Sequence, residues 1–403
     1  MERCGLSVAD FNTYLTHLRS PSIGVQTRAR LLDMSMGVLE SMPGVVGGTL
    51  NVDTTQPGNP TRSATVILSD PGHTMDWDSN SPSSGAVSMT RQIRLDHVTY
   101  VPALGRRVTC PLITGPIRGF HRNGTEVTLD ITGRDGLLLG QAWRTRTYAK
   151  GRLTTDVIKD MLGFYGGNVN LAGIPNLSHR LPQPLSISKT TVPWTALESL
   201  SSSIDRHLYF DGAGHPLLRT HPVGSALALY EGDQGVHKSD ILGEATADWT
   251  LQSGWYNTVE VTGATPNIHA VAYPPPSHPM HPSNMGGNGA WYVELYQEQN
   301  GNIRTTADAQ ARANRLMAQQ MAQQVNVTAV SKVFPFMHEL DIERLQLKSG
   351  ASNYVMEKFS IDLAGAAMSH GFNQRMHTVK VPRITHKIAG PKPPSHHKKA
   401  KKK

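Results

Sequence analysis

The sequence predicts a mainly β protein of the α+β class, in which two β regions flank a mixed region. Apolar and polar residues alternate at a period of two over about 30–132 and again over about 246–385. Between these ranges the apolar spacing becomes helical. The 403 residues include 37 glycines and 26 prolines, more than the usual share, which favours turn-rich β structure.

Residues 1–29 are expected to form a helix followed by an arm. Apolar residues recur at helical spacing from Phe11 to Leu18, and Ser7 has the character of an N-terminal cap. Pro21 is expected to end this helix, because proline cannot continue a helical hydrogen-bond pattern.

Residues 30–135 are expected to form the first β domain, a barrel or a sandwich. Its apolar residues share strand faces in sets separated by polar residues, such as Ala64, Val66 and Leu68, or Val127, Leu129 and Ile131. Cys110 lies on such an apolar face, which predicts a buried and unreactive thiol.

Residues 136–245 are expected to form an α+β middle domain. One helix is predicted over 156–165 and a second begins at Pro193, which suits a first helical position. A hairpin is predicted around the glycine-rich turn at 211–214.

Residues 246–385 are expected to form the second β domain, with an inserted helix over 307–324. Met317 and Met321 lie one turn apart on this helix, which predicts packing against a sheet. A change of apolar face predicts a β-bulge near Glu343 and Arg344.

Residues 386–403 are expected to form a flexible basic tail. The chain has a formal charge of +8, and six lysines without any acid lie within 391–403. The remaining sequence is nearly neutral, which excludes the broad positive field of a DNA-binding domain. Weak candidates for contact with a polyanion or a partner are therefore the tail lysines Lys392, Lys398, Lys399, Lys401, Lys402 and Lys403.

Cys4 and Cys110 are too few for a disulfide framework or a cysteine-rich zinc site, and they fit a reducing compartment. No recognisable leader is expected. No stretch approaches the roughly 18 apolar residues of a membrane span, so membrane insertion by this chain is not expected either.

No pattern in the sequence predicts catalysis, a metal site or a cofactor. His278 and His281 lie in a proline-rich segment, and His396 and His397 lie within the basic tail. A local group of His207, Asp205 and Asp211 carries acid–base residue types, but each aspartate occupies an ordinary turn or helix-end position. Motifs for serine hydrolases, zinc proteases and nucleotide binding do not occur. The protein is therefore expected not to be an enzyme.

The order of the elements carries further information. The first β domain closes with Gly115–Ile117 and then 127–138. A tryptophan-containing helix comes later, and the sequence HLYFDGAGHPLLR follows it at 207–219. WYNTVEVTG at 255–263, a long helix and HELDIERL at 338–345 come next. Over about 30–385 this succession resembles the tail hub proteins of long-tailed bacteriophages, including baseplate hubs and minor tail proteins.

The resemblance implies two tube-type β-barrels related by duplication, with the α+β domain inserted between them. Such a chain would be a structural virion protein, a homotrimeric hub that adapts the sixfold tail tube to a threefold tip. Its expected partners are the distal tail ring, the tape measure protein and downstream tip or receptor-binding proteins, with DNA present only in transit. It would be located at the tail tip of the virion after assembly in the host cytoplasm.

Two alternatives belong to other functional classes. One is a tail-associated cell-wall hydrolase, in which paired carboxylates would flank the bond that is cleaved. The other is a carbohydrate-binding β module for host attachment that uses the aromatic residues Trp77, Trp143, Trp255 and Trp291.

Overall fold

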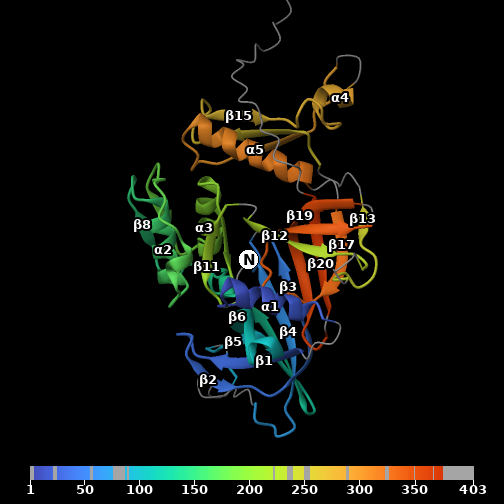
Figure 1. Cartoon of the computed structure of the whole chain (residues 1–403). Coiled ribbons are helices and arrows are strands. Elements are labelled where there is room, and N and C mark those ends of the chain that lie inside the picture. The colour runs from blue at the N-terminus through green and yellow to red at the C-terminus, as the bar shows by residue number, and fades with distance from the viewer. Residues whose placement is uncertain are drawn as a thin grey trace, which may run out of the picture.

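The computed structural model describes most of the chain and confirms a mainly β protein of the α+β class (Figure 1). The described residues are 4–20, 25–54, 58–75, 87–88, 90–220, 223–233, 239–248, 255–286, 290–322, 326–348, 350–365 and 367–374. Among them, no helix has both the length and the apolar character needed to cross a membrane.

The first β unit consists of antiparallel strands, and the predicted alternation sets its burial pattern. Along β4, Ala64, Val66 and Leu68 are buried while their neighbours are more exposed. The 18-residue strand β6 pairs with β5 through its first part and with β7 through its last part. The strands are β1 (Val25–Leu32), β2 (Val38–Ser41), β3 (Val45–Asp53), β4 (Arg62–Ser69), β5 (Gln92–Val101), β6 (Arg106–Asn123) and β7 (Glu126–Thr132).

The second β unit joins the first in one 13-stranded sheet, because β19 pairs antiparallel with β3. A segment around Ile241 forms bridges to Glu231 and Ser331, and so links the end of β12 to β17. β12 lies within the range expected for the middle domain, yet it pairs in parallel with β18. The strands are β12 (Val223–Tyr230), β13 (Thr246–Asp248), β17 (Asn326–Lys332), β18 (Asp341–Leu347), β19 (Gly350–Asp362) and β20 (Ala367–Gln374).

The predicted bulge near Glu343 and Arg344 is wrong. β18 pairs with β19 without a register shift from Ile342 to Leu347, and the shift lies in the neighbouring strand β12. Glu343 shares a strand face with the buried Leu345 and is itself only 1 % exposed. The prediction failed because it assigned a charged residue to the solvent-facing side of the strand.

The middle region has a separate hydrophobic core between α2 (Thr154–Tyr165) and α3 (Pro193–Ser203). Val157, Ile158 and Met161 form the predicted buried face of α2 and lie in one cluster with Trp194 of α3. The shorter elements are β8 (Arg146–Tyr148), β9 (Leu185–Ile187), β10 (His207–Phe210), β11 (Pro216–Arg219) and the 3-10 turns η2 (Arg134–Leu138) and η3 (Leu171–Gly173).

A small α/β unit lies within the range 246–385 and is seen at the top of Figure 1. Its helix α5 covers one face of a three-stranded sheet and forms a third core, in which Met317 is buried. Asn302 donates a hydrogen bond to Ser199 of the middle region, and Arg315 pairs with Asp205. The elements are β14 (Thr258–Thr262), β15 (His269–Ala272), α4 (Pro282–Gly286), β16 (Leu295–Gln299) and α5 (Thr306–Ala322).

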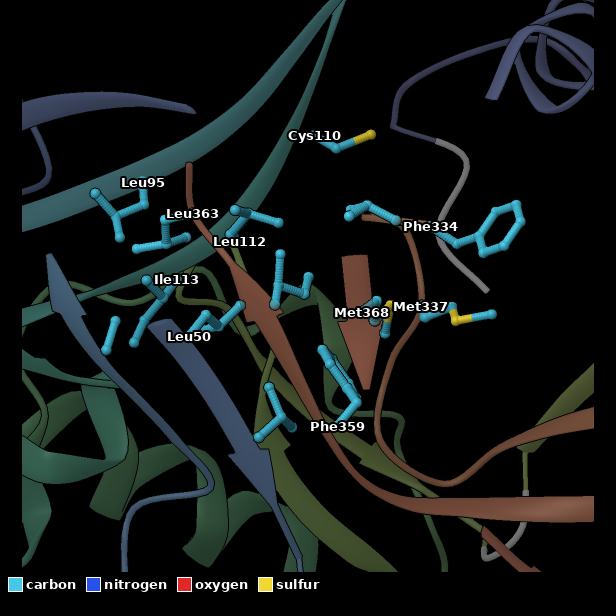
Figure 2. Packing of buried hydrophobic residues seen from close by; sticks show 14 of the residues in the cluster. Leu50, Leu95, Cys110, Leu112, Ile113, Phe334, Met337, Phe359, Leu363 and Met368 are labelled. Carbon is cyan, nitrogen blue, oxygen red and sulfur yellow. The ribbon is translucent and has the colours of Figure 1, made fainter. Parts of the chain in front are cut away.

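The N-terminal helix α1 (Val8–Leu18) packs across both β units. The Ser7 hydroxyl caps it by accepting from the Asp10 amide at 3.2 Å. The Phe11 ring meets Phe336 edge-on with centroids 4.8 Å apart. Arg19 donates to the carbonyl oxygen of Ala228 in β12. One continuous core therefore contains residues of α1 and of both β units. Figure 2 shows part of this core, with residues of the two β units packed together.

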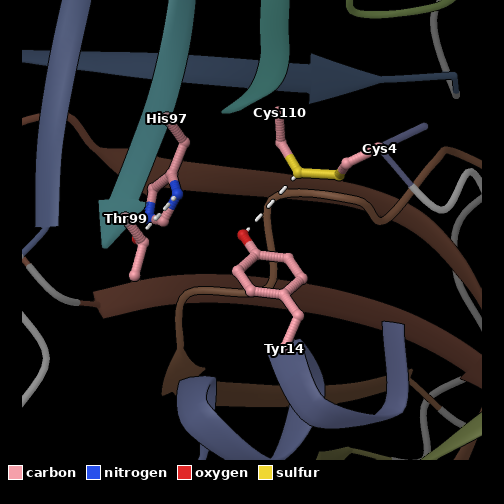
Figure 3. The surroundings of a disulfide bond; sticks show 5 residues. All are labelled: Cys4, Tyr14, His97, Thr99 and Cys110. Atoms are coloured by element: carbon pink, nitrogen blue, oxygen red, sulfur yellow. Dashed lines mark hydrogen bonds between the residues drawn. A yellow bond between two sulfur atoms is a disulfide. The ribbon is translucent and has the colours of Figure 1, made fainter. Parts of the chain in front are cut away.

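Cys4 and Cys110 form a disulfide that ties the segment before α1 to β6 (Figure 3). The Tyr14 hydroxyl lies 3.6 Å from the Cys110 sulfur. The prediction of a free buried thiol at Cys110 is therefore wrong, and the pair no longer supports a reducing compartment. The pairing was hidden because packing of α1, rather than any local motif, brings together two cysteines 106 residues apart.

Candidate functional site

Three segments that carry the family resemblance meet between the two β units and the middle region. They are η2, the turn at 211–214 and the segment 338–341 before β18. Each contributes buried charged side chains, and the start of β4 contributes another. We call this set the junction cluster; its members are Arg62, Arg134, Asp135, Asp211, His338, Glu339 and Asp341.

Arg62 is the central residue of the junction cluster. Its guanidinium lies 2.5 Å from a Glu339 carboxylate oxygen, and it donates to the Leu112 carbonyl of β6 at 2.8 Å. Burial lowers the pKa of Arg62, but the charge and hydrogen bond of Glu339 outweigh this and raise it overall. Arg62 therefore stays charged and joins β4, β6 and the segment before β18.

The turn between β10 and β11 fits closely against β6. Asp211 accepts a hydrogen bond from the His215 amide at 2.8 Å, and Thr114 of β6 donates to the Gly212 carbonyl at 2.9 Å. A Cβ atom at Gly212 would overlap the Pro111 carbonyl oxygen. Only glycine allows this close backbone approach, so the turn is shaped to dock on the first β unit.

η2 supplies the third side of the junction. Asp135 accepts from both the amide and the hydroxyl of Thr61, at 2.6 and 2.8 Å. Burial nevertheless raises the Asp135 pKa to about 6. Arg134 donates to the Gly166 carbonyl at 3.2 Å, and burial lowers its pKa to about 10. The chain leaving the first β unit is thereby attached to the middle region.

The junction cluster is better suited to joining the two β units and the middle region than to acid–base catalysis. A catalytic acid or base must reach a substrate atom within hydrogen-bond distance. The junction carboxylates instead face protein donors, and Glu339 is 1 % exposed. A depression of about 650 Å³ and a cavity of about 200 Å³ in the described part of the chain are both lined by residues outside the junction cluster. The cluster holds three units in a fixed arrangement.

The structure separates the residues considered earlier as an acid–base group. Asp211 belongs to the junction cluster, whereas Asp205 pairs with Arg315 of α5 on the other side of the middle region. The His207 ring lies beside Tyr209, with centroids 5.6 Å apart. The two aspartates therefore take part in different contacts, Asp205 with the α/β unit and Asp211 within the junction cluster.

The sequence interpretation missed Arg62 and Glu339. A signal was present for Arg62, because it occupies the same strand face as Ala64 and Val66. A charged residue in register with an apolar face indicates a buried charge that needs a partner. Glu339 had no comparable signal, since its segment lies outside a regular strand.

The histidines, tail lysines and Trp77 discussed from the sequence lie in different parts of the chain. The nitrogens of His278 and His281 are engaged locally, with the Met280 amide and with Ser283. Within the described ranges, no three or more His, Cys, Asp or Glu side chains are arranged so that they could hold a metal ion. The tail lysines, His396, His397 and Trp77 lie outside the described residues, so their roles stay predictions.

The tryptophans of the carbohydrate-binding alternative are also divided. Trp255, which is partly exposed, and Trp291, which is exposed, both lie on the α/β unit and contact other aromatic rings there. Trp143 belongs to the middle region, where it stacks on Phe164 at a centroid distance of 4.9 Å. The carbohydrate-binding alternative grouped Trp143, Trp255 and Trp291, and the structure places Trp255 and Trp291 on the same unit.

A shallow depression of about 650 Å³ crosses the joint sheet where β3 meets β19. Polar side chains from five strands line it, including Asn51, Asp53, Lys358, Ser360 and Ser369. The surface is continuous across both β units because the sheet itself is continuous.

Comparison with known proteins identifies the fold. No protein-family model and no curated protein matches the sequence. The 43 kDa tail protein of prophage MuSo2 from Shewanella oneidensis superposes with a TM-score of 0.59 at 10% identity, covering 87% of this chain and 99% of that chain. A tail protein from Neisseria meningitidis MC58 gives 0.58 at 12% identity, over 87% and 96% of the two chains. The chain has the fold of these tail proteins, which confirms the predicted resemblance.

Proposed function

We propose that this chain is a structural subunit of a bacteriophage tail, and that three copies form the hub of its tip or baseplate. The observation that carries the proposal is the nearly end-to-end match to a solved tail protein, which leaves no large part of that protein without a counterpart. Each copy contributes two β units, so three copies supply six units to a sixfold tail tube.

In this proposal the hub surrounds the channel through which the tape measure protein and DNA pass. Its neighbours are the distal tail ring on one side and downstream tip or receptor-binding proteins on the other. The hub is part of the virion and assembles in the host cytoplasm.

The junction cluster supports a scaffold role on physical grounds. A subunit that joins rings of different symmetry must keep its units in a defined arrangement while many surfaces contact neighbours. The buried Arg62–Glu339 pair, the β3–β19 ladder and the packing of α1 across both units each favour one rigid body. The proposal also includes the predicted duplication of the two β-barrels and the domain boundaries predicted from the sequence.

A symmetry-resolved image of the assembled particle tests the proposal. We expect threefold symmetry at the position of this chain, with its two β units alternating around a central channel. A sixfold ring of this chain, or a single copy at the tip, would overturn the hub assignment.

The same protein should leave purified cell walls intact in a zymogram. The carboxylates of the junction cluster are buried, so they are not placed to flank a bond of a cell-wall substrate as the hydrolase alternative requires. Cell-wall turnover that is lost on replacement of Asp211 would contradict a purely structural role.

A further inference from the structure

The α/β unit carries a group of exposed and partly exposed aromatic side chains. Trp291 is 56% exposed and Tyr292 is 45% exposed, in the segment that leads into β16. Trp255, Tyr273 and His281 pack against these two rings. We call these five residues the aromatic platform. Exposed aromatic groups gathered in one place mark an interaction surface more often than scattered ones do.

The platform is held in place by the protein itself. Tyr273 and His281 meet the Trp291 ring edge-on, each at a centroid distance of 5.6 Å. Tyr292 stacks on Trp255 at 6.2 Å, and its backbone carbonyl accepts from Asn257 at 2.8 Å. Because the rings are already ordered, a ligand would lose little binding energy to fixing them.

A row of polar side chains lies on the same unit, on the sheet face opposite α5. Val259 and Val261 of β14 point into the α5 core, so Glu260 between them points to the other face. Its two carboxylate oxygens lie 2.7 Å from His269 Nε2 and 2.6 Å from Gln297 Nε2. We call Glu260, His269 and Gln297 the polar row.

Tyr273 connects the platform to the polar row. Ala270 and Ala272 of β15 belong to the α5 core, so His269 and Tyr273, at the alternating positions, point to the sheet face that carries Glu260. The negative charge of Glu260 adds to the effect of burial in raising the pKa of the Tyr273 hydroxyl. An exposed aromatic surface and a set of planar hydrogen-bonding side chains therefore adjoin on one small unit.

We propose that the aromatic platform and the polar row form a binding site for a neutral or amino-sugar polysaccharide. A pyranose ring has a face of C–H groups that packs on an aromatic ring, while its hydroxyls need both donors and acceptors. Glu260 uses two of its roughly four acceptor positions in the polar row, and the Gln297 amide offers both roles.

The charge of the surface argues against a nucleic acid. Platform and row contain no lysine or arginine, and Glu260 and Glu294 are acidic. Glu294 accepts from the Tyr292 hydroxyl at 2.6 Å and so lies beside the platform. A phosphate backbone requires cationic partners and would be repelled here. The site goes beyond the proposed hub function and does not depend on it.

The test uses the purified full chain on an array of neutral and amino-sugar oligosaccharides, followed by calorimetric titration with the strongest ligand. We expect binding that Trp291→Ala weakens by about tenfold or more, as loss of one stacking partner predicts. Trp143→Ala is the matched control, because Trp143 is also 56% exposed but lies on the middle region. It should bind as the unchanged protein does.

Glu260→Gln tests the polar row separately. This change keeps the side-chain shape, removes the charge and should weaken binding several-fold without altering the far-UV circular dichroism spectrum. Absence of signal across the array, or equal losses for Trp291→Ala and Trp143→Ala, would overturn the proposal. So would a Trp291→Ala chain that binds glycans normally but is no longer incorporated into tails, since the platform would then be a protein contact. The symmetry of the particle tests the hub independently.

Discussion

Replacement of Glu339 by glutamine should destabilise the protein strongly, because it leaves a buried charge without its counter-charge. The Glu339 carboxylate lies 2.5 Å from the Arg62 guanidinium, and the two side chains are only 0% and 3% exposed. Removing one partner of a buried ion pair typically costs about 3–5 kcal/mol. Glutamine still offers an acceptor to Arg62, so we expect a loss near the lower end, about 3 kcal/mol.

Urea denaturation followed by circular dichroism measures this loss. The matched control is Glu244→Gln, the same chemical change in the ion pair with Lys348, whose side chains are 81% and 66% exposed. Exposed pairs of this kind contribute about 0–1 kcal/mol. The urea midpoint should therefore fall clearly for Glu339→Gln and hardly at all for Glu244→Gln.

A double variant separates the burial of charge from the loss of packing. Arg62→Met combined with Glu339→Leu removes both charges and keeps apolar volume, so it should recover much of the lost stability. Equal midpoints for Glu339→Gln and Glu244→Gln would refute the reasoning. A double variant less stable than Glu339→Gln would show that the contacts of Arg62 with other groups, rather than the ion pair, hold the junction.

Three further predictions address other features. Gly212→Ala should prevent the 211–214 turn from docking on β6 and should lower the melting temperature sharply. The control is Gly163→Ala in α2, where an added Cβ meets no atom within 4 Å, and this change should be neutral or stabilising by about 1 kcal/mol. A Gly212→Ala variant with an unchanged melting temperature would disprove the close approach. Reduction with dithiothreitol should cost about 2–4 kcal/mol by opening the Cys4–Cys110 link, and Cys4→Ser should show no further loss on reduction. Burial lowers the His370 pKa to about 3 from its usual 6.5, so the unfolded chain binds a proton at a higher pH than the folded chain does. The free energy of unfolding should therefore fall as the pH drops from 6.5 towards 3, by about 3 kcal/mol at pH 4. His370→Gln should reduce this pH dependence in urea titrations at several pH values, and an unchanged dependence would contradict the prediction.

Local elements of the fold could be predicted because short-range patterns determine them. The alternation around Val66 and the helical face of Val157 each require only a few neighbouring residues. The β3–β19 pairing, the parallel β12–β18 pair and the Cys4–Cys110 disulfide join distant segments, and no local pattern specifies them. The separate α/β unit was missed for the same reason, since its strands have the same period as those of the main sheet.

The candidate site was predictable only in part. Asp211 was considered for acid–base chemistry and assigned to an ordinary turn position, while Arg62 was overlooked although it shares a face with apolar residues of β4. Trp255 and Trp291 were grouped by residue type, and the structure supplies what composition cannot, namely the contact of Trp255 with Tyr292 and of Trp291 with Tyr273. Burial of charge and adjacency of surface groups both depend on tertiary packing.

The ladder between β3 and β19 also determines how the chain responds to mechanical force. Thr49–Asp53 and Lys358–Asp362 are aligned antiparallel over five residue pairs. A pull along these strands loads all their backbone hydrogen bonds at once, whereas a pull across them breaks the bonds one after another. The joined β units therefore resist a force along these strands better than a force across them.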